Sequence, residues 1–354
     1  MDVRTLLPAA DSLPASPLFF EVLGALTFAV HLLLMNMLLG LVLIGLARSL
    51  PAGPRPPGLG QQAALIPLAA ALAVNFGVAP LLFVQVLYGQ FLYVSSTLMG
   101  VYWFGLMLAV MLAYALAYRQ KAVLCRGEGK GVALWALMAG CLLYSTFVQT
   151  QNALLLLNPH LWEGYFQKPD GTLLAWSDPT LAPRWLHFVI GSLALGGIAL
   201  AMTGRKRTRK NDPHGAELTR QGLAWFCWAT VAQMVDGLWF LMALPREVML
   251  SFMGGNPVAS ALLLLGIGLA TLALVFGFRA RLMPASGAAV ATVLVMVAIR
   301  EAARQAYLAP FFDAAALPVR PEPSTVALFL GCFTCALAVI WWAMRHPATD
   351  CKGA

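Results

Sequence analysis

Long apolar stretches alternate with short polar segments along the whole chain. Each stretch is long enough for an α-helix to cross about 30 Å of hydrocarbon, which takes about 20 residues. The longest connections, 158–184 and 304–324, are too short to fold as domains and are expected to pack as loops on a membrane face. The pattern therefore predicts a single transmembrane domain over 1–354, with nine helices near 20–47, 62–87, 95–117, 132–157, 185–203, 221–245, 258–278, 284–303 and 325–344.

The composition agrees with this pattern. Hydrophobic residues make up 60% of the chain and charged residues 11%, against roughly 45–50% and about 25% in soluble domains. Such an apolar excess has to face lipid, and helices satisfy their own backbone hydrogen bonds there. We therefore expect an all-α, multi-pass bundle in a bacterial inner membrane. The first 20 residues lack the features of a cleavable signal, so the first helix is expected to remain.

Lysine and arginine are distributed unevenly between the two sides that alternating helices define. One side collects 16 of the 23 basic residues: Arg48, Arg55, Arg119, Lys121, Arg126, Lys130, Arg205, Lys206, Arg207, Arg209, Lys210, Arg220, Arg279, Arg281, Arg345 and Lys352. Positive residues resist translocation, so that side is expected to be cytoplasmic. The amino terminus is then periplasmic and the carboxyl terminus cytoplasmic.

The net charge of +8 does not indicate nucleic-acid binding, because the basic residues lie at helix ends, where topology and anionic lipid account for them. The six cysteines lie in predicted helices or on the inner side, so disulfides are not expected. Cys332 and Cys335 form a CxxC within the ninth helix, where the spacing places two small side chains on one face. No CxxCH motif occurs, so covalently attached heme is not expected.

A few strongly polar residues remain inside the predicted helices, and these carry the functional information. Burying such groups in hydrocarbon costs several kcal/mol, so those present are usually paired, ligating or lining a cavity. At about 1.5 Å per residue, all of them fall in the outer half of the membrane. They are His31, His187, Asp236, Arg300, Glu301 and Arg304, with Gln149, Gln151 and Asn152 of the fourth helix.

Two imidazoles in an apolar bundle, with arginines at the adjacent rim, are typical of a heme b site. His31 and His187 are the candidate iron ligands, and Arg300 and Arg304 are candidates to pair with heme propionates. Interhelical hydrogen bonds explain the histidines equally well when each is taken alone. Snorkelling towards water is the matching alternative for the arginines.

Several segments, taken in order, resemble subunit I of the cytochrome bd quinol oxidases. They are ALTFAVHLLLMNMLLG at 25–40, VNFGVAP at 74–80, QNALLLLNP at 151–159, RWLHFVIGSLALGG at 184–197 and REAARQAYLAPF at 300–311. Each motif is weak, but together they are collinear over nearly the whole chain. The resemblance implies that His187 ligates a low-spin heme b near the periplasm and that His31 matches a second heme-ligating histidine.

The sequence also departs from that family. A heme-ligating glutamate expected about ten residues before Arg304 is replaced by Leu294, and 102–115 contains none of the expected proton-supplying carboxylates. The long quinol-binding loop is reduced to 245–257. The seventh helix lacks the methionine that ligates the low-spin heme. Met253 is therefore a candidate ligand, with Met249, Met234 and Met242 as alternatives.

These observations predict a heme b electron-transfer subunit that moves electrons between membrane quinone and a periplasmic partner such as a cytochrome c. One or two hemes and a second membrane subunit are compatible with this interpretation. Oxygen is not expected to be the substrate. Two alternatives stay open: a divergent bd-type quinol:oxygen oxidase subunit, and a heme-free membrane scaffold or transporter, although no internal repeat supports transport.

Overall fold

The computed structural model describes residues 3–345, so His346, Cys351 and Lys352 lie outside the described residues. Within that range the chain is helical, and it has nine helices long and apolar enough to cross a membrane. The predicted all-α membrane bundle is confirmed at this level. The nine helices are α1 (Pro17–Ser49), α2 (Leu59–Leu98), α3 (Gly100–Cys125), α4 (Val132–Leu157), α5 (Leu181–Thr208), α6 (Gly215–Ala243), α8 (Pro257–Phe278), α9 (Leu282–Leu308) and α10 (Pro323–Arg345).

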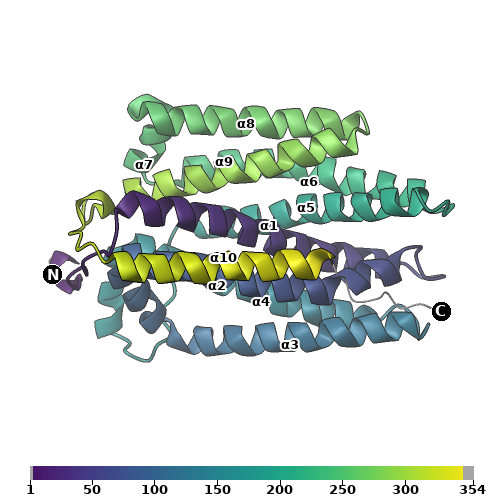
Figure 1. The fold of residues 1–354 in the computed structure, drawn as a ribbon, viewed down its shortest axis with the longest axis horizontal. Coiled ribbons are helices and arrows are strands. Elements are labelled where there is room, and N and C mark those ends of the chain that lie inside the picture. The colour runs from purple at the N-terminus through teal and green to yellow at the C-terminus, as the bar shows by residue number, and fades with distance from the viewer. Residues whose placement is uncertain (1–2, 346–354) are drawn as a thin grey trace.

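The helices lie side by side along one axis, and successive helices run in opposite directions (Figure 1). We call the end where α1 begins the N-terminal end and the other the opposite end. The two long connections both lie at the N-terminal end, as predicted. The first contains the 3-10 helix η2 (Pro159–Phe166), and the second contains η4 (Ala314–Ala316). Between α6 and α8 lie the short α7 (Arg246–Leu250) and η3 (Ser251–Gly255).

The boundary between the second and third predicted helices was wrong. The prediction ended one helix at 87 and began the next at 95, but α2 continues to Leu98 and bends at Tyr88 (φ −130°, ψ 29°). The segment after the bend contains glycine and polar residues that resemble a loop, yet no proline interrupts it. Its hydroxyls bond to its own backbone, since Thr97 donates to the carbonyl of Tyr93 at 2.8 Å. Packing of buried apolar side chains such as Phe91 and Leu92 keeps the segment helical.

Three further helices run past their predicted ends. The third was expected to end at 117, but α3 runs to Cys125. The fifth was expected to end at 203, but α5 runs to Thr208 and includes Arg205, Lys206 and Arg207 in its last turn. Cations there interact favourably with the negative end of the helix dipole. The eighth was expected to end at 303, but α9 runs to Leu308, so that Arg304 lies within the helix.

Small residues bring α5 and α6 together. Gly197 of α5 faces the backbone of α6, and a Cβ added there would lie 2.6 Å from the nitrogen of Phe226. No larger side chain fits at that distance. Glycine at such positions lets two helix backbones pack closely in a membrane, where the hydrophobic effect does not drive association. This close contact is what positions α6 against the histidine of α5.

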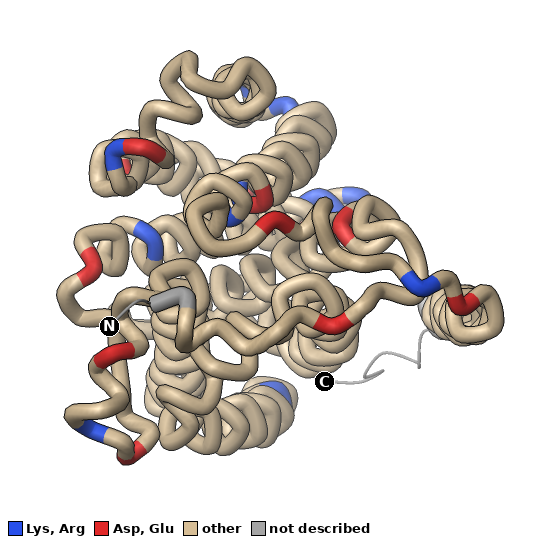
Figure 2. Tube along the Cα trace, turned by 90° about the vertical axis from the view of Figure 1, so that its left-hand side faces the viewer, with Lys and Arg blue, Asp and Glu red and all other residues tan. Residues whose placement is uncertain are grey.

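Large apolar side chains cover much of the outer surface, and they contact lipid in a membrane-spanning bundle. Leu112 of α3, Leu264 of α8 and Leu328 of α10 are all exposed. Helix α10 lies at the edge of the bundle (Figures 1 and 2) and meets it through Phe329, whose ring centroid is 5.7 Å from that of Phe83. Seen from the N-terminal end, basic and acidic residues are interspersed around the loops (Figure 2).

Candidate functional site

His187 lies in the second turn of α5 and points at α6. Its Nδ1 is 2.9 Å from Oδ2 of Asp236, whose side chain is only 5% exposed. Asp236 is thus the hydrogen-bond partner of His187. The sequence analysis identified both residues but did not predict that they pair. The other carboxylate oxygen of Asp236 is buried without a hydrogen-bond partner among the described residues. The carboxylate therefore acts on the imidazole rather than on a wider network.

An arginine and an aromatic ring complete the surroundings of His187. Arg184, one turn earlier on α5, places its guanidinium carbon 4.9 Å from the ring centroid of Phe240, and the His187 ring centroid lies 6.0 Å from the same point. The Nε of Arg184 is buried and has no hydrogen-bond acceptor within the part of the chain that the structure describes. Tyr307 of α9 lies close enough to interact with the charge of Arg184. We call these residues the His187 group.

His31 lies near the middle of α1 and faces α2. Its Nδ1 is 2.8 Å from the backbone oxygen of Ala73. Gly77, one turn further along α2, makes room for the ring, because a Cβ there would lie 2.7 Å from Cε1 of His31. Phe28 lies one turn before His31, with ring centroids 6.4 Å apart. Helix α2 thus supplies both the hydrogen-bond acceptor and the space for this imidazole. We call His31, Phe28, Ala73 and Gly77 the His31 group.

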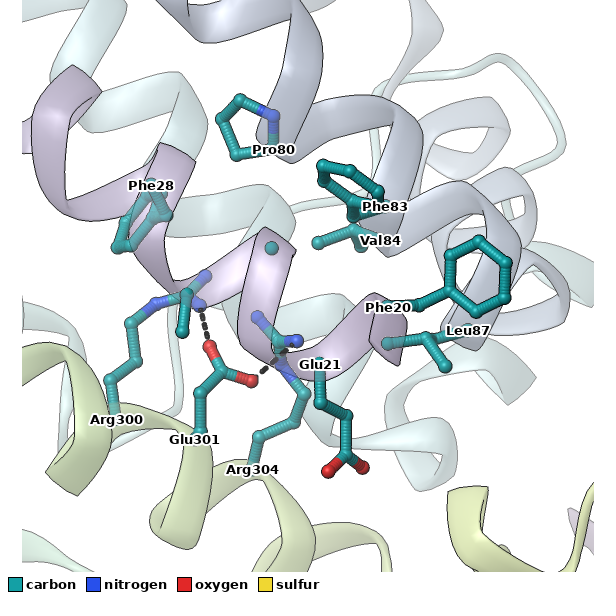
Figure 3. A pocket seen from close by; sticks show the side chains of 12 residues that line it. Phe20, Glu21, Phe28, Pro80, Phe83, Val84, Leu87, Arg300, Glu301 and Arg304 are labelled. Atoms are coloured by element: carbon teal, nitrogen blue, oxygen red, sulfur yellow. Dashed lines mark hydrogen bonds and ion pairs between the residues drawn. The ribbon is translucent and has the colours of Figure 1, made fainter. Parts of the chain in front are cut away.

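The two predicted arginines lie with the His31 group and not with the His187 group. Arg300 places its guanidinium carbon 4.3 Å from the ring centroid of Phe28, and Arg304 lies 4.7 Å from that of Tyr88. Both bond to one carboxylate: Glu301 accepts from Arg300 at 2.8 Å and from Arg304 at 2.9 Å (Figure 3). Each oxygen of the Glu301 carboxylate thus pairs with one arginine.

Simple snorkelling is also excluded for Arg304. Its side chain is 7% exposed and stays inside the bundle. A cavity of about 20 Å³ adjoins it, between α1, α2 and α9, and its lining includes Glu21 and Phe83 (Figure 3). That volume holds about one water molecule. The cavity cannot hold a porphyrin, so any fit to heme rests on the ligand atoms and not on this space.

The hydrogen bonds decide which nitrogen of each imidazole is free. A backbone carbonyl can only accept, so Nδ1 of His31 must carry the hydrogen, and the lone pair of the neutral ring is then on Nε2. The Asp236 carboxylate sets the same tautomer in His187. Metal-ligating histidines typically donate their second ring nitrogen to a carbonyl or carboxylate in this way. The donor set at both positions fits axial ligation of heme iron.

The remaining polar residues of the sequence argument have other positions. Gln149 is exposed. Gln151 accepts a hydrogen bond from the backbone of Ala175 at 2.7 Å, and Ser96 donates to Asn152 at 3.4 Å. These two residues connect α4 to the loop before α5 and to α2. Cys332 and Cys335 are both exposed on α10.

The candidate methionine lies in an irregular segment. Met253 is 59% exposed and sits in η3, a single π-helical turn with a non-helical backbone at Met253 and at Gly254, where φ is 111°. Such turns often occur at functional sites. No measured contact joins Met253 to His187, so its role as a ligand stays a prediction.

Comparison with known proteins gives no family. No protein-family model matches the sequence, and no curated protein matches it either. Among the described residues, no three His, Cys, Asp or Glu side chains come together as a site for a metal ion. The two histidine groups are therefore the features of the described residues that indicate a function.

Proposed function

We propose that the chain is a heme b protein of a bacterial inner membrane that passes electrons between the quinone pool and a periplasmic partner such as a cytochrome c. In this proposal it is a divergent relative of bd oxidase subunit I, with its amino terminus in the periplasm. One observation carries the proposal: each membrane-embedded imidazole has its Nδ1 held by an oxygen, 2.8 Å away for His31 and 2.9 Å for His187, which leaves Nε2 as a ligand.

In this proposal, different residues bind the iron, orient the imidazole and pair with the propionates. A bound heme b supplies one-electron exchange between ferric and ferrous iron. His187 and His31 would hold the heme iron, and Asp236 would keep the His187 ring oriented through its hydrogen bond to Nδ1. Arg184, whose Nε has no acceptor among the described residues, would pair with a propionate near His187 in addition to its interactions with Tyr307 and Asp178. Arg300 and Arg304 could bind a propionate near His31 only in addition to the Glu301 carboxylate, with which both already pair.

A specific observation also favours a heme-free membrane protein. Glu301 already neutralises much of the charge of both arginines, so the arginine pair needs no propionates to be stable in the membrane. In that case the imidazole of His187 serves the α5–α6 contact alone. The two proposals predict different absorption spectra for the purified protein, one with heme bands and one without them.

The test is the reduced-minus-oxidised absorption spectrum of the full chain, purified from cells that make heme. We expect bands of low-spin heme b and none from a chlorin heme. His187→Ala removes an axial bond and should abolish the low-spin bands without loss of protein. His160→Ala is the matched control, because His160 is an exposed histidine at the same end of the bundle.

Two results contradict the proposal. A parent protein without heme bands supports the heme-free reading, and equal spectra in the parent, His187→Ala and His160→Ala remove His187 as a ligand. Quinol addition then tests the electron donor, since the heme should be reduced by a quinol analogue within seconds. Oxygen uptake driven by quinol would support the oxidase alternative instead.

A further inference from the structure

A second cavity lies at the opposite end of the bundle, away from both histidine groups. It is open to the surface, has a volume of about 590 Å³, and is formed where the turn between α8 and α9 meets the side of the α5–α6 hairpin. Its lining includes Arg205, Thr208 and Arg209 from α5, Thr219 from α6, and Arg281 from the turn.

The floor of this cavity is apolar. Leu282, the first residue of α9, packs against Ala201 of α5 and Leu223 of α6, and all three are buried. This contact fixes the α8–α9 turn against the hairpin. The turn is tight, since Ala280 adopts a left-handed backbone conformation with φ 54°, which an L-residue rarely takes. Its backbone places Arg281 beside the cavity, opposite Arg205 and Arg209.

The three arginines of the cavity are not neutralised by the protein. The two acidic residues near the turn of the hairpin pair with other cations, because Asp212 pairs with Arg207 and Glu217 pairs with Arg220. Arg205, Arg209 and Arg281 have no carboxylate within 4.0 Å in the described part of the chain. Three arginines from two segments over 70 residues apart thus line one cavity without a carboxylate partner among the described residues.

The position of the cavity indicates where its ligand comes from. The α8–α9 turn ends short of the α5–α6 hairpin along the axis of the bundle (Figure 1), so the cavity opens on the side of the bundle, at the end of a membrane-spanning helix. Exposed apolar side chains continue from it into the hydrocarbon region, among them Met283 of α9 and Phe278 of α8. A ligand here meets cations at one end and an apolar surface at the other.

We propose that this cavity binds the phosphodiester headgroup of an anionic phospholipid. Guanidinium groups bind phosphate oxygens through paired, charge-assisted hydrogen bonds, and basic pockets between transmembrane helices suit anionic headgroups. Free phosphate shares this chemistry, but the apolar side chains beside the cavity match acyl chains and not a soluble ion. The site is independent of heme binding and of the proposed function.

Native mass spectrometry of the full chain in detergent tests the proposal, with dioleoylphosphatidylglycerol and dioleoylphosphatidylcholine as the probes. The cavity variant is Arg205→Gln/Arg209→Gln/Arg281→Gln. The matched control is Lys206→Gln/Lys210→Gln/Arg279→Gln, which removes the same number of charges from the same two segments but not from the lining. Both variants lose non-specific attraction equally.

We expect the parent and the control to prefer phosphatidylglycerol. Each lining arginine should change the dissociation constant about fivefold, so the cavity variant should lose roughly 100-fold. Equal loss in both triple variants overturns the proposal, as does an equal affinity for the two lipids. Displacement of the bound lipid by millimolar inorganic phosphate overturns the lipid as the ligand. If the cavity variant does not purify as a single species, Arg281→Gln is compared with Arg279→Gln, both on the exposed turn.

Discussion

Replacing Asp236 by asparagine tests how the protein prepares His187. Asparagine keeps the size of the side chain and an acceptor for Nδ1, but it removes a charge that is almost fully buried. A hydrogen bond to a charged partner contributes about 1.5–3 kcal/mol, against about 0.5–1.5 kcal/mol for a neutral one. The exchange should therefore weaken the hydrogen bond that orients the imidazole by about 1 kcal/mol or more, while the fold is kept.

This loss should appear as weaker heme binding and a changed redox potential. Removing an outer partner of a metal-ligating histidine typically costs about 10–100-fold in affinity. If His187 binds heme as proposed, the carboxylate would stabilise the ferric state, so its loss should raise the midpoint potential of that heme by tens of millivolts at an effective dielectric near 20. Hemin titration of heme-depleted protein measures the first effect, and a redox titration of the loaded protein measures the second.

Asp170→Asn is the control, because Asp170 is a carboxylate of the same end of the bundle that contacts Thr172 and Lys168 and not His187. It should leave affinity and potential unchanged. Unchanged values in Asp236→Asn as well would refute the reasoning, since the hydrogen bond would then have no influence on a ligand. A fall in potential would refute it too, because the sign follows from the charge alone.

Three further predictions follow from other residues. A reporter placed in 158–184 should be periplasmic and one placed after Lys352 cytoplasmic; the reverse result inverts the orientation. Gly77→Ala should displace the imidazole of His31, because the new Cβ would lie 2.7 Å from Cε1, and the heme spectrum should change; an unchanged spectrum removes His31 as a ligand. Arg304→Gln should lower a heme potential by tens of millivolts if a propionate shares this arginine; an unshifted redox titration removes it from the site.

The number and direction of the helices could be predicted from the sequence because lipid imposes a length and a composition on every crossing. The ends of the helices could not be predicted where the sequence is ambiguous. The segment after Tyr88 combines glycine, glutamine and serine with large apolar residues, and only packing decides that it remains helical. In the same way the basic end of α5 is both a topology signal and a regular last turn of helix.

The candidate site was predictable in its residue types but not in its pairings. His31 and His187 were identified because buried imidazoles are rare. Their partners depend on how each helix is rotated about its axis, which hydropathy does not fix. The acceptor for His31 is a backbone oxygen of Ala73, 42 residues away, and a backbone atom leaves no trace in the sequence. Arg184 was not among the predicted site residues, although its three-residue spacing to His187 is the signal that could have placed it beside that histidine.

The polar groups that were expected to converge in one leaflet form two separate groups in the structure. The His187 group is built on α5 and α6, and the His31 group is built on α1 and α2, with α9 contributing Tyr307 to the first and the arginine pair to the second. Each imidazole has its own acceptor and its own aromatic neighbour. Because the two acceptors belong to different helices, Ala73 on α2 and Asp236 on α6, loss of one histidine should leave the other correctly oriented.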